Sequence, residues 1–187
     1  MQSSNQKWAF DAVHSSVNFT VRHMVVSKVR GQFTRWDGTL AMDENDPTSG
    51  SVEVSIDTSS VNTGVDQRDA HLRSADFFDV ERYPAITFRS RKVEKAGAGA
   101  LKITGDLTIH GVTRPVVLDA EYAGSAKDPW GGVRAGFSAR AVIDRKDFGL
   151  TYNQLLETGG VLVGETVEIG IEVELVKQVG APAAVAA

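Results

Sequence analysis

The sequence contains no cysteine, and it also lacks long apolar runs. Without a thiol there can be no disulfide framework and no thiolate chemistry. No stretch approaches the ~20 apolar residues of a membrane span, so we expect no membrane span. The first ten residues hold no apolar core of signal-peptide length. We therefore expect a cytoplasmic protein, or a periplasmic or secreted one if a leader was removed before residue 1.

Basic charge is also scarce, since the formal net charge is -4. The densest basic stretch is the scattered group Arg89, Arg91 and Lys92. A nucleic-acid binder needs a basic face to neutralise phosphates, and a polybasic membrane anchor needs a cluster of lysine and arginine. We expect neither nucleic acid nor an anionic membrane surface as a partner. The sequence leaves a homodimer open.

Local motifs for catalysis, cofactors and metals are missing. There is no G-x-S-x-G, no phosphate-binding loop, no G-x-G-x-x-G and no H-E-x-x-H. Of the four histidines, His14 and His23 lie nine residues apart, which puts them on opposite faces of an unbroken strand. Asp11 and His14, three apart, meet only if the chain turns. We predict no catalytic residue, no cofactor and no metal site.

Apolar residues instead recur at every second position in one segment after another. The clearest segment covers residues 167–175, where valine, isoleucine and leucine alternate with Glu168, Glu172 and Glu174. The same alternation marks residues 17–21, 52–56, 86–88, 101–109, 116–122 and 135–143. Such a pattern places one face in a core and the other in water, and it predicts antiparallel strands.

The alternation changes phase once near the start of the chain. Around His14 and Ser15 the apolar positions shift by one residue, from Trp8 and Phe10 to Val17 and beyond. A one-residue slip would reverse the facing of every later side chain in the sheet. The sequence therefore predicts a bulge or kink at this point.

A second interruption lies at residues 63–74. Thr63 and Asp66 have the spacing of a helix capping box, with aspartate in place of the usual glutamate. Val65 and Leu72 then fall on one apolar stripe. We predict a helix of about two turns here.

The predicted helix also carries the densest polar cluster of the chain, over residues 66–73. One interpretation is a solvated helix face with local ion pairs. The other is a polar mouth, where Arg68 or His71 meets the head of a ligand. The sequence alone leaves both open.

About eight antiparallel segments with one short helix are typical of a β-barrel or a two-sheet sandwich. We expect one domain over residues 1–177 and a disordered tail over residues 178–187. An eight-stranded barrel is either filled by side chains or holds one small ligand. Several inward positions carry little volume, but small residues facing large ones would also give a solid core. The small inward residues are Ser90, Gly105, Ala120, Ala135, Ala139 and Ala141.

Seven motifs, in this order along the chain, together resemble the YceI-like proteins. They are WAFDAVHSSVNF at residues 8–19, followed by Val21 and His23; TG at 63–64; RDAHL at 68–72; DFFD at 76–79; YPAITF at 83–88; GDLTIHGVT at 105–113; and RKDFG at 145–149. The resemblance runs from about Trp8 to Leu175. It implies an all-β fold, an extended eight-stranded antiparallel barrel that is lipocalin-like. It also implies a long apolar ligand inside the barrel, such as a polyisoprenoid or a fatty-acid-amide-like lipid, and no agreed reaction.

The resemblance supplies the expectation that the barrel is hollow, and the inward parity supplies its lining. We predict that Ala139 and Ala141 keep the interior open. The predicted ligand-binding residues are Phe19, Val21, Phe88, Leu107, Leu118, Phe137, Ala139, Ala141, Ile169 and Ile171. The function that follows is carriage, storage or sequestration of the ligand.

Two other functions remain open at the level of sequence. One is an enzyme that acts on an isoprenoid-type lipid, with His14, His23 or His71 as acid or base. The other is a stress-related structural protein with an incidental cavity.

Overall fold

Strands make up most of the chain, and they lie where apolar residues alternate. The computed structural model describes residues 6–24, 26–157 and 160–178. The predicted tail, from residue 179 on, lies outside the described residues. The elements are β1 (Gln6–Phe10), β2 (Ser16–His23), β3 (Ser27–Phe33), β4 (Trp36–Asp43), β5 (Asp46–Asp57), the 3-10 helix η1 (Thr58–Ser60), β6 (Val61–Asn62), α1 (Asp66–Arg73), β7 (Ala85–Lys95), β8 (Ala100–Ile109), β9 (Val112–Lys127), β10 (Val133–Asp144), the 3-10 helix η2 (Arg145–Phe148) and β11 (Val163–Lys177).

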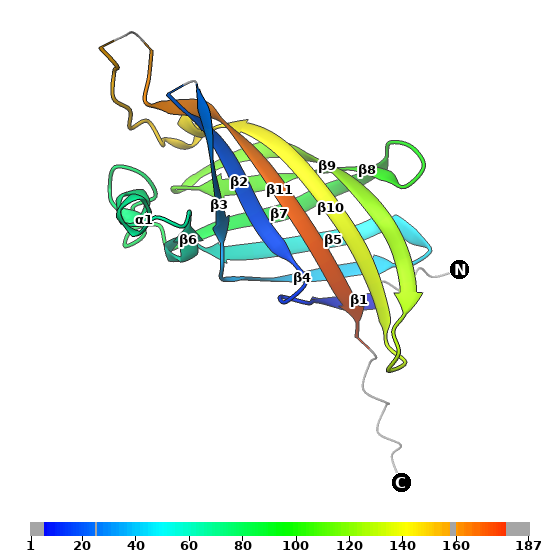
Figure 1. Ribbon diagram of the computed structural model, residues 1–187. Helices are drawn as coiled ribbons and strands as arrows, with labels where there is room; N and C mark the ends of the chain where they lie inside the picture. Colours follow the sequence, from blue (N-terminus) through cyan, green and yellow to red (C-terminus); the bar gives the residue numbers. More distant parts are fainter. Residues whose placement is uncertain (1–5, 25, 158–159, 179–187) are drawn as a thin grey trace.

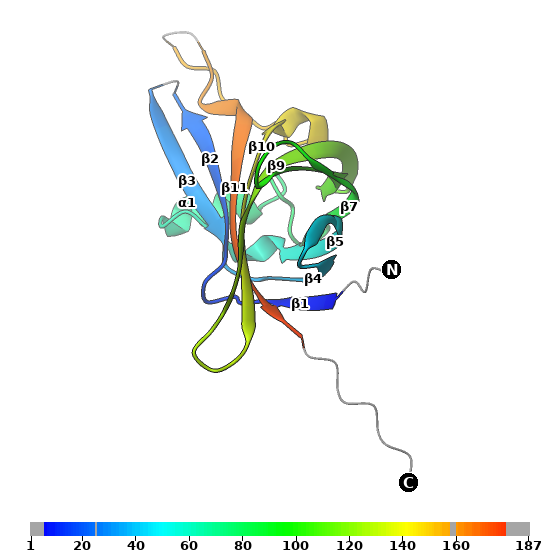
Figure 2. The same ribbon diagram turned by 90° about the vertical axis from the view of Figure 1, so that its right-hand side faces the viewer.

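The strands close into an eight-stranded antiparallel barrel (Figure 1), as predicted. Around the ring the order is β1, β4, β5, β7, β8, β9, β10 and β11, and β1 pairs with β11 to complete it. Strand β2 follows β1 along the same edge of β11, and β3 pairs with β2. The two strands thus extend the barrel wall beyond β1 and β4. Figure 2 shows the β2–β3 hairpin at one end of the barrel and the β9–β10 hairpin at the other.

The predicted break near His14 is a turn over residues 11–15. Strand β11 pairs with β1 at Leu175 and Phe10, and with β2 at Glu172 and Ser16. Five residues, 11–15, therefore lie opposite only two residues of β11, 173 and 174, and the chain loops outward between β1 and β2. The turn is closed by a bond from the His14 backbone amide to the Asp11 carbonyl oxygen, 3.2 Å. The loop absorbs the change of phase, so that both halves keep their apolar side chains inward.

The predicted short helix is α1, eight residues long, which lies beside β6. The predicted capping box is wrong. Val65 stays extended and caps the helix without a side-chain bond, so Asp66 is the first helical residue rather than the third. Thr63 donates instead to the buried Asp69, from its amide at 2.9 Å and from Oγ1 at 2.5 Å. Among the described residues no helix has the length and apolar character of a membrane span.

Two clusters of buried side chains occupy the interior. One contains Phe33, Val61, Ile86, Leu107, Ile109, Phe148 and Leu150. The other contains Trp8, Met42, Ala135 and Leu175. In part of the interior a small residue packs against a large one. Gly105 is an example, because a Cβ added to it would lie only 2.5 Å from Phe88 Cζ. The barrel is therefore solid in these places, and it is hollow in the cavities described below.

Gly105→Ala should destabilise the barrel by about 1–3 kcal/mol. The added Cβ would lie 2.5 Å from the Arg89 carbonyl oxygen, which is backbone and cannot rotate away. Gly170→Ala on β11 is the matched control, because an added Cβ there meets no atom within 4 Å. Urea unfolding of both variants measures the difference, and equal midpoints would contradict the close packing at Gly105.

Candidate ligand cavity

The larger cavity of the barrel lies beside α1, and we call it the helix-end cavity. Its volume is about 680 Å³. Most of its walls come from β2, β3, β11, α1 with the segments on either side of it, and the segment that follows η2. Strands β5, β7, β8 and β10 and the helix η2 each add one residue. Its apolar lining includes Phe19, Val21, Phe33, Ile56, Leu72, Phe77, Phe78, Ile143, Leu150 and Ile169.

A second, smaller space of about 160 Å³ lies further along the barrel, toward the β4–β5 turn, and we call it the inner cavity. Apart from Ser51, the described residues that line it are apolar or glycine. Ile56 and Ile169 line both spaces, so the two cavities adjoin at these side chains. Together they give the barrel an elongated apolar interior with its wider part at the helix end.

Nine of the ten residues predicted from parity line one of the two cavities. Phe19, Val21 and Ile169 line the helix-end cavity. The inner cavity is lined by Phe88, Leu107, Leu118, Phe137, Ala139, Ile169 and Ile171. Ala141 is buried but lines neither space. Sequence reasoning missed Trp36, Tyr152 and Arg145, of which Trp36 lines the inner cavity and the other two the helix-end cavity.

The two residues predicted as a polar mouth both line the helix-end cavity. The Arg68 guanidinium donates from Nε to Thr63 Oγ1 at 2.7 Å and from Nη2 to the Thr63 carbonyl oxygen at 2.9 Å. His71 Nε2 lies 2.9 Å from Asp76 Oδ2. Its ring also packs edge-on against Phe77 and Tyr152, at centroid distances of 5.0 and 4.9 Å. Among the described residues, the arginine and histidine side chains of the interior therefore gather at one end.

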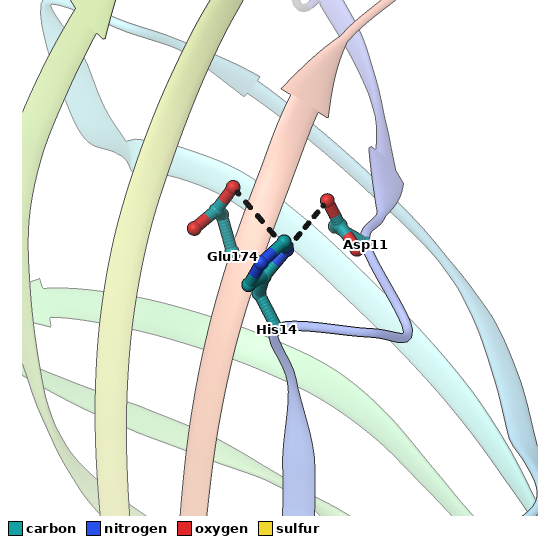
Figure 3. A group of neighbouring side chains, drawn as sticks. All are labelled: Asp11, His14 and Glu174. Atoms are coloured by element: carbon teal, nitrogen blue, oxygen red, sulfur yellow. Dashed lines mark hydrogen bonds and ion pairs between the residues drawn. The ribbon is translucent and has the colours of Figure 1, made fainter.

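A separate polar group lies on the outside of the barrel, at the turn over residues 11–15 (Figure 3). His14 Nδ1 lies 3.1 Å from Asp11 Oδ2 and 4.0 Å from Glu174 Oε1. The sequence indicates that Asp11 and His14 can meet only if the chain turns between them, and this turn brings them together. Glu174 is supplied by β11, 160 residues further on. The ligand atoms of the three lie within 4.8 Å of one another, which is a spacing that a metal ion could use.

Arg134 already pairs with two of these three residues. Its Nη1 donates to Asp11 Oδ2 at 2.7 Å and also to Glu174 Oε1, while its Nε donates to Asp128 Oδ2 at 3.2 Å. These carboxylate oxygens of Asp11 and Glu174 are the same atoms that approach His14. A metal would have to displace a bound guanidinium, so we assign the group to an ion-pair network that ties β10 and β11 to the turn.

The comparisons with known proteins agree with this architecture. The sequence profile of the YceI-like domain matches residues 8–175. The chain belongs to the YceI-like family. The YceI protein of Escherichia coli O157:H7 is 49% identical to it over 137 residues, which are 73% of this chain and 71% of that protein.

Solved structures share the YceI-like barrel. BcnA of Burkholderia cenocepacia superposes with a TM-score of 0.78 at 24% identity, over 88% of this chain and 98% of that one. A polyisoprenoid-binding domain of Saccharophagus degradans, implicated in plant cell wall breakdown, superposes with a TM-score of 0.67 at 19% identity. That match covers 91% of this chain and 98% of the domain. At these identities the likeness concerns the fold.

Extensive dialysis of this YceI-like protein against a chelator should leave its melting temperature unchanged. The reason is that Arg134 already neutralises the carboxylates at the one cluster of suitable ligands found among the described residues. Thermal unfolding before and after dialysis, and after addition of zinc, measures the effect. A fall of many degrees that zinc alone restores would show that a metal is a structural part of the protein.

Acid should weaken the network around Arg134. The Arg134 guanidinium, and after it His14, hold the pKa of the Asp11 carboxyl well below its usual range. A depressed pKa in the folded state stabilises the protein above the ordinary value of about 4, and that stabilisation is lost as the pH falls further. Asp11→Asn should therefore lower the melting temperature at neutral pH. The gap to the wild type should narrow below a pH of about 4, and a gap that stays constant in a pH series of thermal melts would contradict this.

Proposed function

We propose that this chain binds a long apolar ligand, a polyisoprenoid or a fatty-acid-amide-like lipid, inside its barrel. The observation that carries the proposal is the pair of adjoining apolar cavities, about 680 and about 160 Å³ in volume. The larger one alone has the size of an ordinary small-molecule pocket. The likeness in fold to a domain described as polyisoprenoid-binding supports the same class of ligand.

The driving force would be burial of the ligand's hydrocarbon. Each methylene moved from water into an apolar space contributes roughly 0.8 kcal/mol before the entropy losses of binding. Discrimination between chains of similar length would be weak, because one more methylene changes the affinity little. Such a site suits carriage, storage or sequestration of a class of lipids better than recognition of one compound.

Equilibrium titration with two prenyl alcohols tests the proposal. Geranylgeraniol is long enough to extend from one cavity into the other, whereas geraniol is short. Trp36 lines the inner cavity, so its fluorescence should report a tail that arrives there. We expect geranylgeraniol to bind at least about tenfold more tightly than geraniol. Trp36→Phe should remove the optical signal and keep the binding measured by calorimetry.

Failure of both alcohols to bind would contradict the proposal. Equal affinities would also contradict it, because a long chain would then gain nothing from the second cavity. A control for the optical signal is Trp130, which is exposed in the turn of the β9–β10 hairpin and should not respond.

We propose that the barrel binds its ligand and that His14, His23 and His71 do not act as catalytic acids or bases. His14 lines neither the helix-end nor the inner cavity, and it belongs to the Arg134 network. His23 and His71 do line the helix-end cavity, and His71 is paired with Asp76. Turnover of geranylgeranyl esters by the pure protein, lost in His71→Ala or His23→Ala, would instead favour an enzyme.

A further inference from the structure

Arg145 is a buried cation in the wall of the helix-end cavity. It is the first residue of η2, directly after β10, and only 4% of it is exposed. Its Nε donates to the Gly164 carbonyl oxygen at 2.9 Å, and its Nη2 to the Val163 carbonyl oxygen at 3.3 Å. Its Nη1 donates to the Leu150 carbonyl oxygen. All three partners are neutral backbone groups.

These bonds leave the guanidinium with unused donors, and among the described residues no carboxylate lies within ion-pair distance of it. A guanidinium has about five N–H groups, and the three bonds above leave two of them. The carboxylates of Glu165 and Asp144 favour the charged form of Arg145 only through space, and Glu165 pairs directly with Lys146. Burial lowers the pKa of Arg145, which reflects the cost of holding a charge away from water. A buried charge with no carboxylate in direct contact is costly, so an anion beside it would be favoured.

The rest of the cavity lining has the same sign. Among the described residues that line the helix-end cavity, the ionisable ones of basic type are Arg22, His23, Arg68, His71 and Arg145, and none is Asp or Glu. This is a local property, because the chain as a whole carries a net charge of -4. The inner cavity has no ionisable lining residue of either sign in the part of the chain that is described. The elongated interior therefore has one positive end and one neutral, apolar end.

We propose that Arg145 binds an acidic head group of the ligand, and that the tail runs past Ile56 and Ile169 into the inner cavity. This inference rests on the proposed lipid-binding function and adds to it the orientation of the ligand and the chemistry of its head. A carboxylate or phosphate offers acceptors only, which match the two remaining N–H groups of Arg145. Arg68 is half-buried and already holds Thr63 with two bonds, so it is the weaker candidate.

The first experiment compares palmitate with hexadecanol on the wild-type protein, by calorimetry at mildly alkaline pH. The two probes share one chain length and differ in the charge of the head. We expect palmitate to bind about tenfold or more tightly, as a hydrogen bond to a charged group allows. Equal binding, or tighter binding of the alcohol, would overturn the role of Arg145 while leaving the lipid-binding function intact. If neither probe binds, both proposals fail.

Carbon NMR of carboxyl-labelled palmitate in the complex gives an independent reading on the wild type. Beside Arg145 the bound carboxyl should remain ionised below its usual pKa, whereas in an apolar pocket without a cation its pKa would rise. A raised pKa of the bound carboxyl would overturn the proposal.

Three variants assign the effect to a residue. Arg145→Gln should bring the ratio of palmitate to hexadecanol affinity close to one. Arg68→Gln should leave most of the preference for palmitate. Arg89→Gln is the matched control for loss of one positive charge, because Arg89 is 77% exposed and pairs with Glu53. Since Arg145 also holds three carbonyl groups, thermal unfolding must show that Arg145→Gln is folded. If that variant does not fold, Arg68→Gln still tests the assignment. Loss of the palmitate preference in Arg68→Gln would mean that Arg68, and not Arg145, binds the head group.

Discussion

Ala139→Trp should abolish binding of a long chain and leave the barrel folded. Ala139 lies on β10 between Ala120 of β9 and Ile171 of β11, and it lines the inner cavity. An indole ring at this position would occupy the space of about 160 Å³ that the tail needs. Excluding one isoprene unit removes about five carbons from burial at roughly 0.8 kcal/mol each. The dissociation constant of geranylgeraniol should therefore rise by about two to three orders of magnitude.

Geraniol provides an internal control, because it is short enough to stay in the helix-end cavity and should bind the variant as it binds the wild type. Val142→Trp is the matched variant, since Val142 points outward from the same strand and is 67% exposed. In a solid core the substitution at Ala139 would overpack and cost about 1–3 kcal/mol. A badly destabilised Ala139→Trp protein would thus contradict an open inner cavity, and unchanged geranylgeraniol affinity would contradict its role in binding.

Leu175→Ala should destabilise the ligand-free barrel far more than Ile171→Ala on the same strand. Leu175 is fully buried in the cluster with Trp8, Met42 and Ala135, so its truncation should cost about 2–5 kcal/mol. Ile171 is half-buried and faces the inner cavity, where it already lacks packing partners on one side. Its truncation should cost less than half as much.

Urea unfolding of the two variants, both stripped of lipid, measures this difference. Equal losses of unfolding free energy would mean that Ile171 is packed as tightly as Leu175, which contradicts the inner cavity. Addition of geranylgeraniol should stabilise the wild type by mass action, and the gain should grow with ligand concentration.

The strands and the facing of their side chains could be predicted because alternation is a local property. Residues such as Phe137, Ala139 and Ile171 fall inside by parity alone, and the structure places them in the lining of the inner cavity. The phase change near His14 was visible for the same reason. Whether an inward residue faces space or another side chain is not local, and Ala141 shows this, because it is buried outside both cavities.

The groups that the sequence did not indicate depend on contacts across the barrel. Glu174 and Arg134 join Asp11 only because β10 and β11 close the ring beside the first turn. Arg145 is held by carbonyl groups up to 19 residues away, and no local spacing in the sequence marks it as buried. The predicted capping box is wrong because Val65 stays extended, so the helix begins two residues later than the spacing indicates. Spacing rules assume regular elements, and each of these features lies where an element ends.

Mass spectrometry of organic extracts from natively purified protein tests the central claim most directly. We predict a long-chain apolar lipid in near-stoichiometric amount from the wild type and from Val142→Trp, and its absence from Ala139→Trp. An interior that is recovered empty, from a protein that also fails to take up geranylgeraniol, would contradict the claim and would favour a structural role with an incidental cavity.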